Sequence, residues 1–333
     1  MKTKLLLLSA SLLIVNAMSA FAADDSKPDP AQLKYGLYLQ FGMPTFAKPG
    51  QKGQIPASQF APPANLDARS WAHTAREMGM QFAVLTVKHE SGFCLWDSPD
   101  YDYDVGNSPF KGDIIGDFIA ACNAEGVLPG VHYSIPDAYN EGMMRYRGPV
   151  PPPYFNVIKK HITELHTKYP GIRVQIFDVS QRLSPVQWEE LTNIVHRLNP
   201  ACVILDWTHP PIYGTQTVNK GWMWSPNEKL NSPDFLYSVY SKRMESGASW
   251  LANVGIDPSG NIPNEYLEVL KQLKTLIERG PVPGQVNQSA PAGAPAQKPD
   301  AASRLKQVKS LYDQGLINKE EYDKKVKEIM DSL

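Results

Sequence analysis

Short apolar runs alternate with amphipathic segments along most of this chain, and this alternation constrains the fold more than any other feature. The runs that predict strands are residues 35–41, 82–87, 128–133, 174–177, 202–205 and 250–254. The segments that predict helices are residues 67–78, 113–125, 155–169, 185–198, 234–245 and 264–278. Strands and helices that alternate over short connections predict a parallel sheet with right-handed crossovers.

This alternation predicts an α/β fold of the distorted (β/α)₈, TIM-like barrel type. Six clear strand–helix units and two irregular ones suit a barrel. A dinucleotide-binding sheet is disfavoured because no Gly-x-Gly-x-x-Gly motif follows a strand. About 260 residues lie between the N-terminal segment and the Pro-rich tail, which is close to the size of one barrel domain.

The N-terminal segment differs from this alternating body and predicts a signal peptide over residues 1–22. Lys2 and Lys4 precede an apolar stretch, and Ala20-Phe21-Ala22 supplies a small-x-small cleavage pattern. Cleavage near Ala22 predicts a secreted or periplasmic protein, with a barrel over residues 23–280. No later segment is apolar for long enough to predict a membrane span.

The C-terminal part predicts a disordered linker and a small helical hairpin. Residues 281–300 are rich in Pro, Ala, Gly and Gln, which cannot bury a core. Residues 301–333 place apolar side chains at helical spacing, and Asn318-x-x-Glu321 predicts the start of a second helix. This hairpin resembles the SHOCT module, and its small size predicts association with another copy or a protein partner. No β-sandwich is expected after the barrel.

Composition and motifs exclude several functions. The net charge of −1 and the absence of a basic stripe give no indication of a nucleic-acid partner. The three cysteines are too scattered for a disulfide framework or a zinc site, and Cys122 and Cys202 are expected to be buried free thiols. No metal-ligand spacing and no Gly-x-Ser-x-Gly motif is present, so no metal and no cofactor is expected.

Polar residues follow several predicted strands and would meet at one rim of a barrel. They are Gln40, Lys88, His89, Glu90, His132, Tyr133, Ser134, Asp178, Asp206 and Trp207. Paired carboxylates beside aromatic residues suit glycoside hydrolysis, in which one carboxylate is nucleophile or base and another is acid. The chemistry alone therefore favours a glycosidase.

Sequence motifs in the same order resemble the catalytic domain of family 29 glycoside hydrolases, the α-L-fucosidases. The matching stretches are YGLYLQFG, FAVLTVKHESGFCLWDSPDYDYDV, SPFKGDIIGDFIAAC, GVHYSIPD, VQIFDVS and WLANVGIDPSGNIP, which lie within residues 33 to 280. The resemblance implies a distorted barrel, a carbohydrate substrate and a retaining mechanism. It also implies that Asp178 is the nucleophile, because Ile176-Phe177-Asp178 stands where the family has Trp-Phe-Asp.

Several family residues are replaced in this chain. Gln40-Phe41-Gly42 stands for His-Trp-Gly, Glu90 stands for the second histidine of Lys-His-His-Asp-Gly-Phe, and Asp206 follows the fifth strand, where an arginine is usual. The Trp-Glu-Thr segment that holds the acid/base in some members has no counterpart near Thr215-Gln216-Thr217. Donors and cations are thus replaced by acceptors and anions, which predicts a raised pKa for at least one rim carboxyl.

A raised pKa would make Glu90 the candidate acid/base, provided that its carboxyl lies about 5–5.5 Å from that of Asp178. Glu90 could instead accept a hydrogen bond from a different sugar or be a solvated loop carboxylate. Glu228 and Glu141 are weaker acid/base candidates, and each also fits an ordinary surface glutamate. The remaining candidate substrate-binding residues are Gln40, His89, Tyr133, Asp206, Trp222 and Trp224, although Tyr133 and the tryptophans also fit packing roles.

The sequence therefore predicts a secreted, retaining glycosidase that acts through Asp178. Two alternatives remain open: a glycosidase with altered sugar specificity, and an inactive carbohydrate-binding or scaffold protein with a fucosidase fold. An enzyme needs a second carboxyl group within reach of Asp178, whereas a binding protein needs only a cleft and aromatic platforms.

Overall fold

The computed structural model describes residues 27–48, 51, 53–141, 148–206, 213–217, 229–280, 305, 309 and 319–330. The chain divides into two compact units, Met1–Arg279 and Gly280–Leu333. The predicted signal peptide, Trp207, Trp222, Trp224 and Glu228 lie outside the described residues.

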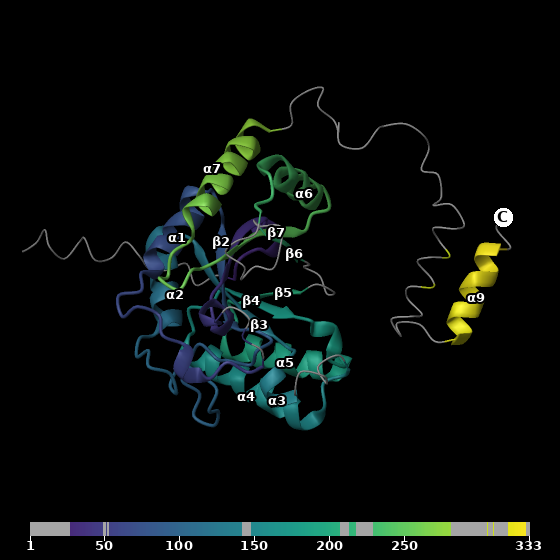
Figure 1. Cartoon of the computed structure of the whole chain (residues 1–333), viewed down its shortest axis with the longest axis horizontal. Coiled ribbons are helices and arrows are strands. Elements are labelled where there is room, and N and C mark those ends of the chain that lie inside the picture. Colours follow the sequence, from purple (N-terminus) through teal and green to yellow (C-terminus); the bar gives the residue numbers. More distant parts are fainter. Residues whose placement is uncertain are drawn as a thin grey trace, which may run out of the picture. The chain divides into compact units, whose positions relative to one another are not determined.

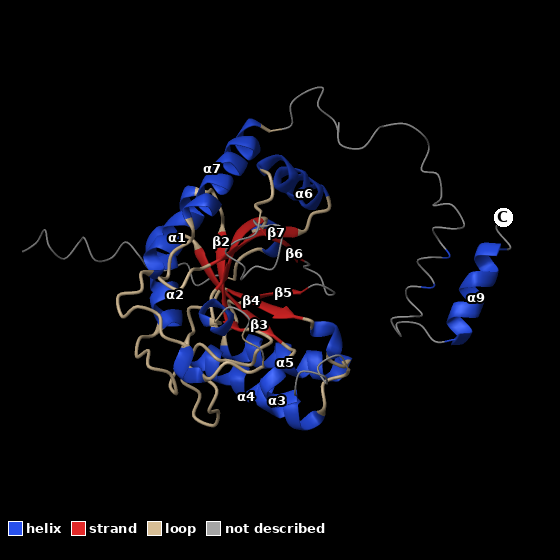
Figure 2. Ribbon diagram, in the orientation of Figure 1, coloured by secondary structure: helices blue, strands red, loops and turns tan. Residues whose placement is uncertain are grey.

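The first unit is built on one parallel sheet, drawn as red arrows in Figure 2. Its strands are β1 (Tyr35–Gln40), β2 (Phe82–Lys88), β3 (Leu128–Ser134), β4 (Val174–Asp178), β5 (Val203–Asp206), β6 (Tyr213–Thr217) and β7 (Ser249–Gly255). They are ordered β5-β4-β3-β2-β1-β7-β6, and every neighbouring pair is parallel. This confirms the expected distorted barrel fold. Strand β6 was not predicted, because the stretch YGTQT has no apolar run.

Helices follow the strands and flank the sheet (Figure 1). They are α1 (Ala68–Glu77), α2 (Ile114–Glu125), α3 (Ala138–Glu141), α4 (Pro152–Lys168), α5 (Pro185–Leu198), α6 (Pro233–Glu245) and α7 (Asn264–Arg279). Asp67, Asp113 and Ser184 cap the predicted helices, because their side chains accept hydrogen bonds from backbone N–H groups in the first turns of α1, α2 and α5. Helix α4 begins earlier than predicted because prolines are tolerated in a first turn.

Two apolar clusters lie on the two faces of the sheet. The smaller cluster contains Tyr38 of β1, Val84 of β2 and Ile176 of β4, with no helix residue among its members. The larger cluster joins the opposite strand face to the helices. Because side chains alternate between faces along a strand, the smaller cluster marks the barrel interior. This assignment decides which residues at the strand ends can face the pocket.

The second unit contains α9 (Lys319–Met330), which lies where the second helix of the hairpin was predicted. Most of the first predicted hairpin helix lies outside the described residues. The resemblance to a SHOCT module therefore stays a prediction. Within the described part of the chain, no helix is sufficiently long and apolar to span a membrane. Cys94, Cys122 and Cys202 are free and buried, as expected for Cys122 and Cys202.

Candidate active site

Asp178 is the last residue of β4 and lies two residues after the interior residue Ile176. Its Oδ2 is 3.7 Å from Nε2 of His132 on β3, and its side chain is 33% exposed while that of His132 is 3% exposed. The Ile135 N–H donates to the Asp178 carbonyl oxygen at 3.0 Å, which ties the end of β4 to the chain after β3. The Asp178 carboxylate therefore lies beside His132 on a backbone tied to the chain after β3, and it remains accessible from solvent.

Glu90 lies just after β2, in a half-buried position. Burial raises the pKa of the Glu90 carboxyl above its usual 4.5, and the charge of Asp178 raises it further. Two carboxyl groups that influence each other in this way ionise at separated pH values. The raised pKa that the sequence predicts for at least one rim carboxyl is thus found at Glu90, and its role as acid/base stays a prediction.

His89, beside Glu90, is neutral near pH 7. Burial lowers the pKa of its imidazole to about 4; the nearby His132 and Lys88 also lower it, against the opposing effect of Asp178. A neutral imidazole has one donor and one acceptor nitrogen. His89 can therefore offer a hydrogen bond to a sugar hydroxyl without adding a cation to the site.

Lys88 pairs with a carboxylate, Asp137. Lys88 Nζ lies 3.2 Å from Asp137 Oδ2, and neither side chain is exposed. Nζ also donates to the Ser134 carbonyl oxygen at 2.9 Å and lies 4.6 Å from the centre of the Tyr133 ring. Burial raises the pKa of Asp137, but Lys88 and Asn140 outweigh it, so the pKa stays below its usual value. Lys88 thus ties the end of β2 to the chain after β3.

Tyr133 and Asp206 face the helices and not the barrel interior. Tyr133 pairs in register with Lys88, and Asp206 with Phe177, a residue of the larger helix-facing cluster. Tyr133 is fully buried, and its hydroxyl is 3.0 Å from Nδ1 of His161. The packing alternative for Tyr133 fits this position better than substrate contact, because strand alternation turns it away from the pocket.

Gln40 lies on the interior side, two residues after Tyr38, but it is 1% exposed. Its Oε1 accepts a hydrogen bond from Thr86 Oγ1 at 3.0 Å. Gln40 therefore belongs to the floor beneath the site, in contact with β2.

Glu141 is neither an ordinary surface glutamate nor well placed as a proton donor. It is buried in α3, where Arg182 Nη1 donates to its Oε2 at 2.8 Å and Arg182 Nη2 donates to its Oε1 at 2.5 Å. Bidentate pairing with an arginine occupies both oxygens of the carboxylate. The sequence did not reveal this pairing, because the two residues are 41 positions apart.

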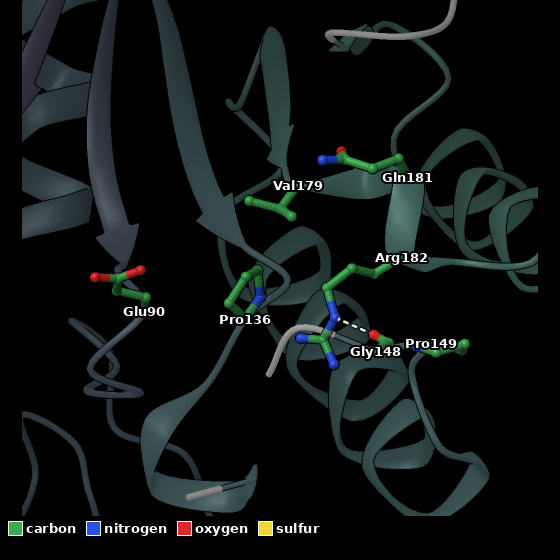
Figure 3. A pocket seen from close by; sticks show the side chains of 7 residues that line it. All are labelled: Glu90, Pro136, Gly148, Pro149, Val179, Gln181 and Arg182. Atoms are coloured by element: carbon green, nitrogen blue, oxygen red, sulfur yellow. Dashed lines mark hydrogen bonds between the residues drawn. The ribbon is translucent and has the colours of Figure 1, made fainter. Parts of the chain in front are cut away.

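A pocket of about 460 Å³ opens at this rim. Figure 3 shows Glu90 on one side and Val179, Gln181 and Arg182 on the other. The remaining lining residues are Pro136, Gly148 and Pro149. Sequence reasoning missed all of these except Glu90, because they come from loops and from the short 3-10 helix Ser180–Arg182, which no strand or helix pattern predicts.

Val179 directly follows Asp178 and has an unusual backbone. Its φ of 56° is the one positive value among the described non-glycine residues. A β-branched residue in the left-handed region costs about 1–2 kcal/mol, and such strain persists only where surrounding contacts impose it. The strain lies next to the candidate nucleophile, at the surface of the pocket.

Gly92 is required for the loop that carries Glu90. Its φ is +93°, and a Cβ there would lie 2.3 Å from Asp137 Oδ1. We expect Gly92→Ala to lower the free energy of unfolding by about 2–4 kcal/mol, measured by urea denaturation. Gly79→Ala is the matched control, because Gly79 has a φ of +73° but a Cβ at this position would meet no atom within 4 Å; it should cost about 1 kcal/mol. Equal losses in both variants would show that the Asp137 contact is unimportant.

Across the described residues, no group of three or more His, Cys, Asp or Glu side chains is placed to hold a metal ion. The candidate catalytic groups at this rim are the carboxyl groups of Asp178 and Glu90, with His89 and His132 beside them.

A parallel barrel sheet with two carboxyl groups at the ends of β2 and β4 is typical of glycoside hydrolases. The family described as alpha-L-fucosidase matches residues 32–214, which is more than half of the chain. The chain therefore belongs to the alpha-L-fucosidase family.

Relatives agree with this assignment. Putative alpha-L-fucosidase 1 of Oryza sativa subsp. japonica is 27% identical over 345 residues, covering 80% of this chain and 63% of the relative. Alpha-L-fucosidase 1 of Arabidopsis thaliana is 23% identical, covering 75% and 60%. The chain thus spans less than two thirds of the length of these relatives.

Solved structures show the same fold. Alpha-L-fucosidase AlfC from Lactobacillus casei, in complex with its alpha-L-fucose product, has a TM-score of 0.64 and 25% identity, covering 75% of this chain and 97% of that one. Alpha-L-fucosidase isoenzyme 1 from Paenibacillus thiaminolyticus has a TM-score of 0.62 and 24% identity, covering 74% of this chain and 73% of that one. The latter likeness concerns the fold alone.

Proposed function

We propose that this protein is a secreted glycosidase that hydrolyses α-L-fucosides, or glycosides of a closely related sugar, with retention of configuration. The observation that carries the proposal is the pair formed by Asp178, an accessible carboxylate at the end of β4, and Glu90, whose carboxyl pKa is raised by burial and by the charge of Asp178. The names of the relatives support fucose as the first sugar to test.

In the first step, the Asp178 carboxylate attacks the anomeric carbon as the bond to the leaving oxygen breaks. The Glu90 carboxylic acid gives its proton to that oxygen, so the leaving group departs as an alcohol. The product of this step is a glycosyl ester on Asp178 and an ionised Glu90.

In the second step, Glu90 acts as the base. Its carboxylate accepts a proton from water, and the resulting hydroxide equivalent attacks the anomeric carbon and releases Asp178. Two inversions give net retention. Glu90 ends protonated and Asp178 ionised, which restores the starting state.

The neighbouring histidines suit these roles. His132 Nε2, 3.7 Å from Asp178 Oδ2, lies beside the carboxylate and can orient it. His89 is neutral and can bind a sugar hydroxyl. Glu90 stands where the resemblance implies a sugar-contacting histidine, so the proposed acid/base also changes the set of donors that the sugar meets.

The experiment that tests this function is hydrolysis of a panel of aryl glycosides, with the anomer of the first-formed sugar followed by NMR. We expect turnover of the α-L-fucoside or of a related 6-deoxy sugar, with retention. Turnover with inversion would overturn the double displacement. No turnover across the panel, by folded protein that still binds a sugar, would favour the carbohydrate-binding function instead.

A further inference from the structure

The two candidate catalytic carboxyl groups lie on different loops, and one short element contacts both. This element is the turn formed by Asp137 and α3. Asp137 Oδ1 accepts hydrogen bonds from the backbone N–H groups of Tyr139 at 2.9 Å and Asn140 at 3.0 Å. The Asp137 N–H donates to Glu141 Oε2 at 3.2 Å, so the carboxylates at the two ends of the turn both bind its backbone. We call this element the Asp137–Glu141 turn.

The first end of the turn holds the loop of Glu90. Asp137 forms the fully buried ion pair with Lys88, which lies two residues before Glu90. The Ala138 N–H donates to the Glu90 carbonyl oxygen at 2.8 Å. Gly92 packs so closely on Asp137 that no Cβ fits between them. The backbone of Glu90 is therefore fixed relative to Asp137.

The second end holds the segment that follows Asp178. The Glu141 carboxylate accepts hydrogen bonds from both terminal nitrogens of Arg182. Arg182 Nε donates to the Gly148 carbonyl oxygen at 2.6 Å. The Arg182 N–H donates to the carbonyl oxygen of Val179 at 3.2 Å, which closes the turn around this strained residue. Figure 3 shows the hydrogen bond from the Arg182 guanidinium to Gly148. Arg182 thus anchors the backbone next to Asp178.

We propose that the Asp137–Glu141 turn sets the separation between the carboxyl groups of Glu90 and Asp178, through Lys88 at one end and Arg182 at the other. This inference deepens the proposed function and rests on it. Glu141 and Arg182 are positioning residues in this account, since they act through the backbone of Val179 and not on the sugar. Buried ion pairs add little to stability relative to apolar side chains, and their best-attested use is to fix one arrangement.

The test compares two double variants that each remove the charges of the second ion pair together. Glu141→Met with Arg182→Met removes the link, whereas Glu141→Gln with Arg182→Gln keeps a hydrogen-bonded link. Both double variants leave the local net charge unchanged, so they do not by themselves shift the pKa of Glu90 through net charge. The charged or titratable side chains near Glu90 are those of Asp178, Arg182, Lys88, His89, His132 and Asp137. Glu190→Gln, which breaks an exposed pair with Lys159, is the control.

The main readout is the pKa of Glu90, measured by NMR of ¹³C-labelled glutamate carboxyls and assigned with Glu90→Gln. With the link removed, Asp178 moves away and the pKa of Glu90 falls towards 4.5; the glutamine pair retains more of the elevation. We also expect kcat to fall about 10-fold or more in the methionine pair, with a smaller change in KM. This readout needs no turnover, so a wild type inactive on every glycoside would disprove the function without deciding the inference.

A folded methionine pair in which the pKa of Glu90 is unchanged would overturn the proposal. So would a change of equal size in Glu190→Gln. If the methionine pair does not fold, Glu141→Ser with Arg182→Ser takes its place, because these short side chains also remove the link and both charges. An unaltered pKa of Glu90 in the folded serine pair would show that Arg182 and Glu141 serve stability alone.

Discussion

Replacing Asp178 by asparagine is expected to lower kcat on the preferred aryl glycoside by about 10³-fold or more. The amide has the shape of the carboxylate but cannot attack the anomeric carbon to form a stable ester. Because Asp178 is 33% exposed and its carbonyl group is held by Ile135 through the backbone, the fold should survive the change. Steady-state kinetics with thermal melting of the same samples check both expectations.

The matched control is Asp100→Asn, because Asp100 forms an exposed ion pair with Lys160 and lies outside the pocket. It should leave kcat unchanged. Asp178→Ala should regain activity with azide, which fits the vacated space and gives a glycosyl azide of inverted configuration. A product of retained configuration, or kcat within 10-fold of wild type in Asp178→Asn, would show that another group is the nucleophile.

The strand and helix pattern could predict where the site lies but not the ion pairs that hold its residues in place. Asp178 and Glu90 follow apolar runs, so topology alone places them at the same rim. Alternation along β3 would also have assigned His132 to the interior and Tyr133 to the helices, had it been applied strictly. Strand β6 could not be predicted, because a polar stretch with a glycine has no strand pattern.

The two ion pairs could not be predicted because their partners depend on loop paths. Lys88 meets Asp137, and Arg182 meets Glu141, only after the chain beyond β3 folds back over the ends of β2 and β4. Nothing in the composition of these loops distinguishes a buried pair from two exposed charges. The left-handed conformation of Val179 could not be predicted from the sequence either, since valine is among the residues least suited to it.

Glu90→Gln is expected to lower kcat by about 10²–10⁴-fold on glycosides with poor leaving groups and far less on those with good ones. Glutamine keeps the size of the side chain but cannot donate the proton that a basic leaving oxygen needs. A leaving group that departs as a stable anion needs no such proton. A plot of log kcat/KM against leaving-group pKa should therefore steepen in the variant.

The pH dependence supplies a second test of the same residue. Wild type needs Asp178 ionised and Glu90 protonated, so activity should rise with pH as Asp178 ionises and fall as Glu90 loses its proton. Because the pKa of Glu90 is raised above 4.5, that fall lies at higher pH than for an ordinary glutamate. Glu90→Gln should remove the fall and leave the rise, whereas Glu190→Gln should keep both.

The same substitution should also stabilise the protein at neutral pH. Folding raises the pKa of Glu90, so its protonated form is favoured in the folded state, and the stability that it contributes is lost as pH rises through the folded pKa. Glutamine resembles the protonated form at every pH. A small rise in Tm at pH 7 that disappears near pH 4, together with the loss of activity, would mark Glu90 as a residue kept for catalysis at the expense of stability. An unchanged Tm and an unchanged kcat would show that Glu90 is a solvated loop carboxylate.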